Sequence, residues 1–163
     1  MKLASTVLCV TLALNVTAAF GHGDAPQKKS AYSAAQLEEK PFGKAGDAKK
    51  ITRTVTISMS DKMRYTPDTL TIKRGDTIRF VVKNSGKVMH ELVIGSMNDL
   101  KAHAELMKKF PGMEHDEPYM AHVAPSRSET LVWQFTQAGG FYFGCLIPGH
   151  FEAGMIGKIT VKS

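Results

Sequence analysis

The sequence predicts an all-β protein, a sandwich or barrel of short strands, with one short helix inserted between two of them. Three observations support this prediction. From residue 51 onward, apolar residues recur at alternate positions in several short segments, which is typical of strands with one buried face. Glycine, proline and aspartate separate these segments, as turns require. One stretch near residue 100 has helical spacing instead.

Seven segments have the apolar pattern of strands. In chain order they are residues 51–59, 70–72, 78–82, 88–94, 130–135, 141–145 and 155–161. Gly75 and Asp76 indicate a turn before the third segment, and Gly139 and Gly140 indicate one before the sixth. Short strands separated in this way are typical of a β-sandwich or a barrel.

The helix is predicted over residues 98–109. Ser96 and Asp99 have the spacing of a capping box, in which a serine and an acid three residues later bond each other's backbone N–H groups. Three apolar residues then share one helical face: Leu100, Ala104 and Met107. A Pro-Gly pair at residues 111–112 ends the pattern.

The first 21 residues have the features of a secretory signal peptide. Lys2 precedes an apolar stretch over residues 3–14, and small residues lie near the end. The apolar stretch is shorter than the roughly 20 residues that a membrane-spanning helix needs. We therefore expect export to the periplasm, with no membrane anchor in the mature protein. Cleavage after Gly21 and cleavage after Ala19 both fit the sequence.

The remainder divides near residue 50. Residues 22–50 are rich in Ala, Lys, Gly and Glu and contain few large apolar residues, which predicts a flexible N-terminal arm. Residues 51–163 carry the strand pattern and are long enough for one domain with a single core.

Export changes the cysteine count. The chain has 2 cysteines, and removal of the signal peptide removes Cys9 and leaves Cys145. A single thiol in an oxidising compartment is open to oxidation or intermolecular pairing unless something protects it. Metal binding would protect Cys145, and the alternative is that it is a buried, inert residue of the core.

The loop that contains Cys145 carries two more metal-type donors, His150 and Met155, in the spacing Cys-x4-His-x4-Met. Sulfur donors combined with imidazole suit copper better than zinc, calcium or magnesium. Two histidines and one cysteine with a weak axial methionine form a blue-copper electron-transfer site, so one more histidine is needed. His90, in the predicted strand 88–94, is the obvious candidate. We therefore predict a copper site formed by His90, Cys145, His150 and Met155.

Most of residues 51–163 resemble the cupredoxins, small periplasmic blue-copper domains. The resemblance rests on Tyr65-x-Pro67, Lys73-Arg74-Gly75-Asp76, Asn84, His90 and the loop from Cys145 to Met155. It implies a Greek-key β-sandwich that holds one type 1 copper. The ligand spacing is similar to that of rusticyanin and auracyanin, whereas the Cys–His gap of plastocyanin is shorter. Met89-His90-Glu91 and the insertion that bears methionine and histidine are similar to the copper-tolerance cupredoxins of proteobacteria.

One residue departs from the family pattern. Several cupredoxins have asparagine directly after the first histidine ligand, where it ties two ligand loops together. Glu91 stands at this position, so that bond is not expected here. Apolar residues around the ligands, and a proline at position 148 that cannot donate to the sulfur, predict a relatively high reduction potential.

The charge and the ligand set limit the function classes. The net charge is +6, and loss of Lys2 with the signal peptide leaves +5. The charge is diffuse, without a basic stripe interleaved with aromatic residues, which argues against nucleic acid as a partner. The first hypothesis is a monomeric electron carrier with acidic redox partners. The alternative is a copper-tolerance protein with a second copper site. An enzyme with several copper centres is disfavoured, because no His-x-His motif is present.

A second copper site has candidates in the insertion and near the N-terminus. Met113, His115, Met120 and His122 lie close together in sequence, and His103 precedes them. The alternative is that the methionines fill the core and the histidines are ordinary surface residues, which we favour for His103. After cleavage His22 would be the first or third residue, where its imidazole and the chain terminus form a copper chelate.

The apolar residues of the ligand loop allow two interpretations. They are Leu146, Ile147, Pro148 and Phe151. Either they form a patch around His150 on which a partner docks, or some of them cover the core.

Overall fold

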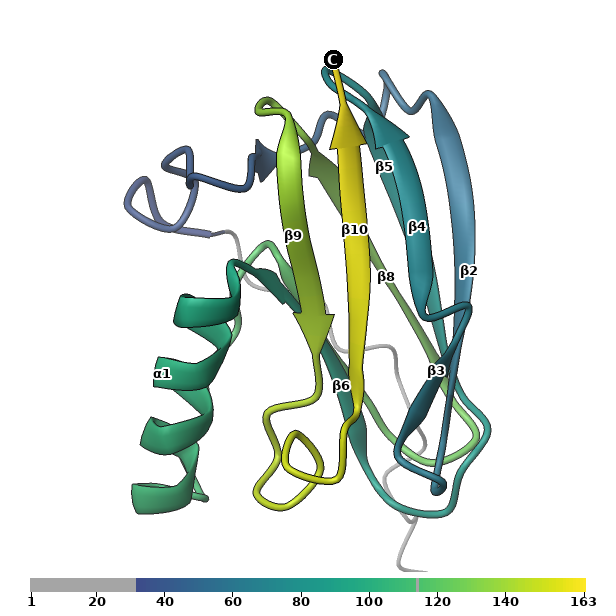
Figure 1. The fold of residues 1–163 in the computed structure, drawn as a ribbon, viewed down its shortest axis with the longest axis vertical. Helices are drawn as coiled ribbons and strands as arrows, with labels where there is room; N and C mark the ends of the chain where they lie inside the picture. Colours follow the sequence, from purple (N-terminus) through teal and green to yellow (C-terminus); the bar gives the residue numbers. More distant parts are fainter. Residues whose placement is uncertain (1–31, 114) are drawn as a thin grey trace, which may run out of the picture. The chain divides into compact units, whose positions relative to one another are not determined.

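A computed structural model of the protein describes residues 32–113 and 115–163. Within these residues ten strands form two sheets, and one helix lies beside them (Figure 1). The elements in chain order are β1 (Lys44–Ala45), β2 (Arg53–Ser60), β3 (Arg64–Thr66), β4 (Thr69–Lys73), β5 (Thr77–Asn84), β6 (His90–Gly95), α1 (Met97–Lys109), β7 (Met120–Val123), β8 (Ser128–Gln134), β9 (Gly139–Gly144) and β10 (Ile156–Lys162).

The two five-stranded sheets have the orders β1-β8-β5-β2-β3 and β4-β10-β9-β6-β7. They lie one in front of the other in Figure 1. The pairs β2–β5 and β4–β10 are parallel, and the remaining pairs are antiparallel. Alternate side chains of β5 point into the space between the sheets, where Ile78, Phe80 and Val82 are fully buried. The predicted all-β sandwich is thus confirmed.

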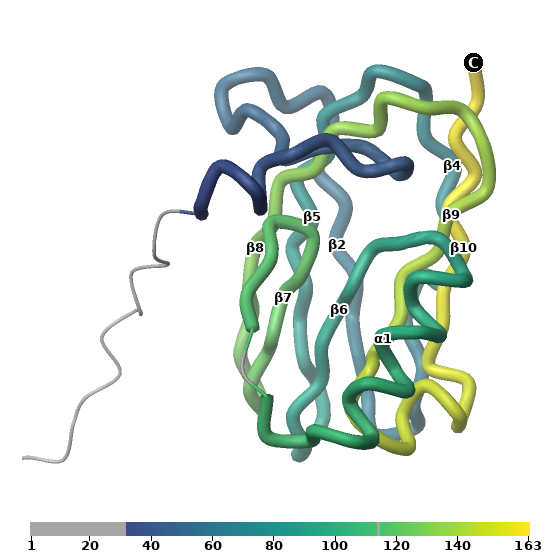
Figure 2. The backbone as a smooth tube through the Cα atoms, turned by 90° about the vertical axis from the view of Figure 1, so that its left-hand side faces the viewer, coloured from purple at the N-terminus to yellow at the C-terminus, as the bar shows by residue number. Residues whose placement is uncertain are grey.

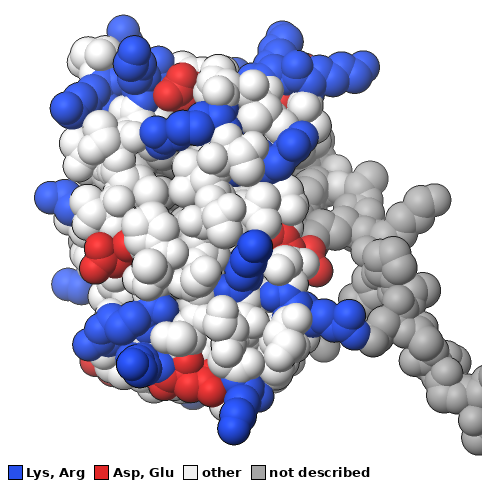
Figure 3. Space-filling model, turned by 90° about the vertical axis from the view of Figure 1, so that its right-hand side faces the viewer, with Lys and Arg blue, Asp and Glu red and all other residues white. Residues whose placement is uncertain are grey.

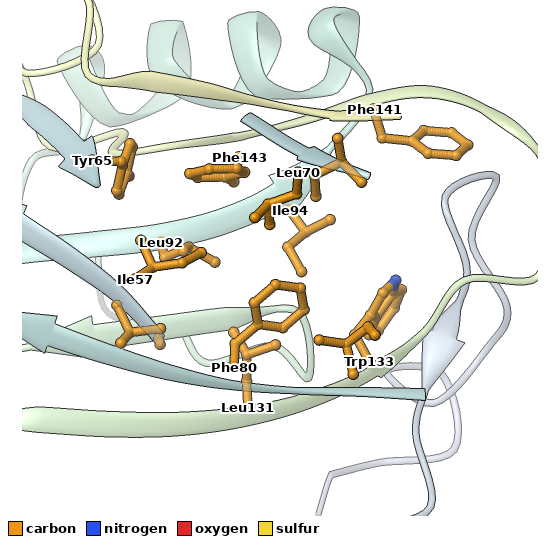
Figure 4. Close-up of a cluster of buried hydrophobic side chains, with 14 of the residues drawn as sticks. Ile57, Tyr65, Leu70, Phe80, Leu92, Ile94, Leu131, Trp133, Phe141 and Phe143 are labelled. Carbon is orange, nitrogen blue, oxygen red and sulfur yellow. The ribbon is translucent and has the colours of Figure 1, made fainter. Parts of the chain in front are cut away.

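Aromatic and aliphatic side chains together fill the core between the sheets (Figure 4). The rings of Tyr65 and Phe143 meet edge to face with centroids 4.8 Å apart. Phe80 and Trp133 are also buried, at 0% and 1% exposure. Large rings in contact contribute both buried area and a preferred geometry, so they hold the strand ends in defined positions.

Helix α1 confirms the predicted helix and its cap. The Ser96 Oγ accepts the backbone N–H of Asp99 at 3.2 Å, and the Asp99 carboxylate accepts the backbone N–H of Ser96 at 3.3 Å. Its buried face is the predicted one: Leu100, Ala104 and Met107. This face packs against Val93, Met120 and Leu146 in a second, smaller core. The helix therefore lies against the outer side of the sheet that contains β6 and β9 (Figure 1).

The structure departs from the predicted flexible arm over residues 32–50. Strand β1 pairs with β8, and Phe42 is only 4% exposed. Its ring stacks on Trp133 at 5.5 Å, and the indole N–H donates to the Phe42 carbonyl at 2.9 Å. One buried ring and one strand pairing are enough to attach a polar segment to a domain. The polar composition of residues 32–50 therefore led to a wrong prediction. The predicted signal peptide at 1–21 and the residues 22–31 lie outside the described part.

The charge of the surface is spread out, as the sequence suggested. Figure 3 shows one face of the molecule, where lysine and arginine form separate groups with acidic residues among them. Uncharged residues occupy the centre of this face. None of the helices in the described residues is both long and apolar enough to cross a membrane.

Candidate metal centre

The predicted ligands come from the ends of three neighbouring strands. His90 is the first residue of β6, Cys145 directly follows β9, and Met155 directly precedes β10. Because β9 lies between β6 and β10 in the sheet, these residues become neighbours although His90 is far away in sequence. His150 lies in the loop between β9 and β10, at the lower end of the molecule in Figure 1.

Three of these residues bring their donor atoms together. The donor atoms of His90, Cys145 and His150 all lie within 4.8 Å of one another. The Cys145 Sγ is 3.3 Å from His150 Nδ1, and the two imidazole centroids are 5.0 Å apart. In the part of the chain that the structure describes, no other three His, Cys, Asp or Glu residues meet this criterion.

Met155 belongs to the same loop and is fully buried in the core cluster that contains Cys145. Its backbone N–H donates to the His150 carbonyl, and its own carbonyl accepts the N–H of Cys145, both at 3.1 Å. The backbone therefore holds the two sulfur residues side by side across the β9–β10 connection.

The state of His90 tests whether a metal fits. Its Nε2 lies 3.1 Å from the Asp61 carboxylate, which accepts the ring proton and leaves Nδ1 with a free lone pair. Among the described residues, this Nδ1 is the one buried side-chain nitrogen or oxygen without a hydrogen-bond partner. Such an atom is unfavourable unless a partner is supplied. A metal ion supplies one, and two imidazoles with a thiolate suit copper.

Asp61, which no sequence pattern singles out, orients His90. It lies in the turn between β2 and β3, in the sheet opposite to that of His90. The backbone N–H of Lys87 donates to its carboxylate at 2.8 Å, and this bond, with a smaller effect of His90, lowers the pKa of Asp61. A charged carboxylate is therefore available to hold the imidazole, the usual outer partner of a metal-binding histidine.

Cys145 keeps its proton when no metal is bound. Burial raises the pKa of its thiol to about 12, and the charge of Glu91 adds to this effect. The backbone N–H groups of Glu91 and Ile147 act in the opposite direction, the former at 3.5 Å from Sγ. Because the thiolate is the form that binds a metal, the incoming ion has to displace this proton.

Glu91 forms hydrogen bonds between ligand segments that the family resemblance did not lead us to expect. Its side chain is buried, and Oε1 accepts the backbone N–H of Leu146 at 2.6 Å, beside Cys145. Its Oε2 pairs with His122 Nδ1 of β7 at 3.0 Å. The residue after His90 thus still joins two ligand segments, although it is a carboxylate. Bonding to Glu91, the largest effect, raises the pKa of His122.

The apolar residues of the ligand loop divide between core and surface. Leu146 is 1% exposed and belongs to the smaller core, where Phe151 packs against it. Ile147 is half-buried, whereas Pro148 is exposed. Leu146 therefore covers the core, as one of the two interpretations predicts. Docking of a partner, the other interpretation, applies only to the more exposed residues of the loop.

The structure separates the residues considered for a second copper site into a core residue and a group of neighbouring histidines. Met120 is 1% exposed and packs in the smaller core. His103 and His115 lie with ring centroids 4.6 Å apart, and His122 lies 6.0 Å from His115. His103 therefore has a histidine neighbour, which a lone surface residue would lack. His22 lies outside the described residues.

Comparison with known proteins decides the family. Residues 51–162 match the model of the copper-binding proteins of the plastocyanin/azurin family. The chain belongs to this family. The family and the donor cluster together identify the cofactor of this cupredoxin as copper.

Relatives of this cupredoxin have been named for copper resistance. A protein called copper-resistant cuproprotein CopI from Rubrivivax gelatinosus is 46% identical over 160 residues, which cover 98% of this chain and 97% of the relative. A protein of the same name from Pseudomonas aeruginosa is 33% identical over 153 residues, covering 74% of this chain and 82% of the relative.

A solved structure confirms the fold of this cupredoxin. Dithionite-reduced auracyanin from Roseiflexus castenholzii superimposes with a TM-score of 0.59 and 24% identity, covering 69% of this chain and 99% of that one. The predicted Greek-key β-sandwich is therefore the observed architecture.

Proposed function

We propose that this protein is a periplasmic copper-tolerance protein that binds copper at a type 1 centre formed by His90, Cys145, His150 and Met155. One observation carries the proposal: the donor atoms of His90, Cys145 and His150 lie within 4.8 Å of one another, and the buried His90 Nδ1 has no hydrogen-bond partner among the described residues. Two relatives bear the name copper-resistant cuproprotein, one of them 46% identical over nearly the whole chain. These names favour copper tolerance over general electron transport.

Each ligand has a defined role in this proposal. Cys145 would hold copper as its thiolate, and the two histidines would bind through Nδ1. Met155 would add a weak thioether donor, which favours Cu(I). When bound, copper contributes exchange between its two oxidation states. The strands and the Asp61 and Glu91 bonds hold the ligands, so little rearrangement accompanies that exchange.

The proposed location follows from the N-terminal sequence. A basic residue, a short apolar stretch and small residues over 1–21 support secretion. The periplasm is an oxidising compartment, where copper would protect the single remaining thiol. Detection of the cleaved chain in a periplasmic extract, with its mass, would test both the location and the cleavage site.

Electron transport is the second candidate function. It is favoured by the hydrogen bonds that hold the ligand segments and by the position of His150, which is partly exposed. The positive net charge would attract acidic redox partners to a monomeric carrier. Neither candidate function requires a catalytic reaction.

Growth on copper separates the two functions. We expect a strain that lacks the gene to be copper-sensitive and the wild-type gene to restore tolerance. The Cys145→Ser variant should fail, because it lacks the thiolate. Thr54→Ala, on the exposed face of β2, is the matched control and should restore tolerance. A deletion strain that tolerates copper normally but grows poorly without added copper would favour the electron carrier.

The visible spectrum tests the ligand assignment directly. Copper-loaded protein should show an intense thiolate-to-copper absorption band. The intensity of this band should stop increasing once the type 1 centre is filled. Cys145→Ser should abolish this band. Survival of the band in that variant would contradict the proposed centre.

A further inference from the structure

A pocket beside α1 and β6 contains a second group of copper-type donors. It has a volume of about 570 Å³ and is lined by residues of α1, of β6 and of the segment that leads to β7. Figure 2 shows the backbone course of these three segments. Three potential ligands line it: His103 from α1, and Met113 and His115 from the segment after α1. Met113 is 39% exposed, so its thioether has not been taken up by the core.

The two histidines of the pocket have nearly the same mutual geometry as the two histidines of the type 1 centre. His103 and His115 have centroids 4.6 Å apart and ring planes at 48°. His90 and His150 have centroids 5.0 Å apart and ring planes at 49°. Two imidazoles at this separation can direct one nitrogen each to a common ion about 2 Å away.

Hydrogen bonding leaves one nitrogen of His115 available. Its Nδ1 lies 3.2 Å from the Met113 carbonyl. A carbonyl oxygen only accepts, so Nδ1 carries the proton and Nε2 keeps its lone pair. His90 is prepared in the same way, with one ring nitrogen occupied and the other free.

His122 supports this segment without being a ligand. Its Nε2 donates to the His115 carbonyl at 3.0 Å, and its Nδ1 pairs with Glu91 at 3.0 Å. Both ring nitrogens are therefore engaged. The pair of bonds ties the backbone of His115 to β6, so the segment has a defined place beside α1.

The charges that line the pocket favour a cation. Asp99 and Glu117 contribute two carboxylates, against one ammonium group from Lys40. The excess of negative charge compensates a bound metal ion.

We propose that His103, His115 and Met113 bind a second copper ion in this pocket. Two imidazoles and a thioether form a soft, low-charge donor set, which selects Cu(I) over zinc and over the harder cations. The site is distinct from the type 1 centre, because the two sites share no donor residue. Its role as a holding site for excess copper rests on the proposed function, whereas the binding itself does not.

The test is an anaerobic Cu(I) titration of the mature protein against a colorimetric Cu(I) chelator. All samples carry His22→Gln, so that an N-terminal chelate does not contribute. We expect the parent protein to bind one more Cu(I) than the His103→Gln/His115→Gln double variant. Met113→Leu should weaken this additional site at least about tenfold, since even changes outside the ligand shell commonly have that effect.

Two controls keep the result specific. Lys101→Gln, an exposed residue of the same helix, should leave the additional Cu(I) in place. The thiolate-to-copper band, recorded after oxidation of each sample, reports folding and the type 1 centre separately.

Equal Cu(I) binding by the parent and the double variant, at equal affinity, would overturn the second site. So would an additional site that binds Zn²⁺ as tightly as Cu(I). A missing thiolate-to-copper band in every sample would instead contradict the type 1 centre, so the two failures are distinguishable.

Discussion

Glu91 connects three segments of the site through one buried carboxylate. Its backbone N–H faces the Cys145 sulfur, Oε1 holds Leu146 and Oε2 holds His122. A buried carboxylate is tolerated when its oxygens are bonded in this way. The residue next to His90 therefore positions the Cys145 loop and also the insertion that carries the second group of histidines.

Truncation of Glu91 tests this connection. In Glu91→Ala the buried N–H of Leu146 loses its acceptor, which should lower the free energy of unfolding by about 1–3 kcal/mol. Glu91→Gln keeps an acceptor oxygen and should have a smaller effect. Denaturant unfolding of the metal-free proteins measures both. Equal destabilisation by the two variants would show that the charge, rather than the Leu146 bond, matters.

The raised pKa of Cys145 predicts a pH dependence of copper binding. Its pKa of about 12 means that the thiol is protonated throughout the neutral range. Copper that binds at the type 1 centre therefore releases this proton. As the pH falls the proton competes better, so the affinity should decrease about tenfold per pH unit for the one proton displaced. Competition with a chelator of known pH dependence, between pH 6.5 and 8, measures the slope. A flat profile would mean that the thiol is already ionised.

Among the elements, the segment before β2 shows the strongest effect of tertiary packing. Phe42 packs edge to face on Tyr119 at 5.3 Å and stacks on Trp133, so it joins the start of the described chain to the end of the sandwich. The sequence around it is polar, and this contact could not be inferred from a local pattern.

Removal of the Phe42 ring should destabilise the whole domain. We expect Phe42→Ala to lower the free energy of unfolding by about 3 kcal/mol, as is typical for large buried aromatic residues. Leu37→Ala is the control, because Leu37 is 48% exposed, and it should change the value by less than about 0.5 kcal/mol. Thermal or denaturant unfolding distinguishes them. Wild-type stability of Phe42→Ala would indicate that the segment is an independent arm after all.

The elements that were predicted correctly from the sequence are those in which apolar residues recur at the regular spacing of a strand or a helix. The strand at 78–82 and the helix from 98 to 109 have several apolar residues on one face, and both were found within a few residues of their predicted ends. Strands β1, β3 and β7 have two to four residues each, too few for a period to be recognised. They exist because a neighbouring strand offers a hydrogen-bonding edge.

In the whole molecule, the Asp61–His90 bond links the two sheets at the candidate metal centre. The proposed ligands lie on the sheet of β6, β9 and β10, while Asp61, which holds His90, extends from the turn of the opposite sheet. Occupation of the centre should therefore strengthen the contact between the sheets at this end of the sandwich.

Copper should stabilise the folded protein measurably. A ligand that binds only the folded state at about 100 times its dissociation constant adds about 2.7 kcal/mol. We expect a corresponding rise in the melting temperature of wild-type protein and a much smaller rise for Cys145→Ser. Calorimetry with and without copper measures the difference. The same rise in both proteins would indicate that the stabilising copper binds elsewhere.

The sequence by itself determined the donor loop, the sandwich class and the helix with its cap, because each depends on residues close together in the chain. Spacing placed Cys145, His150 and Met155 in one loop, and chemistry then required a distant histidine. Only the tertiary structure decided which groups surround these residues. The Asp61–His90 bond, the Glu91–His122 pair and the His103–His115 neighbourhood each depend on how the strands pair and on where the helix docks, so no local pattern contains them.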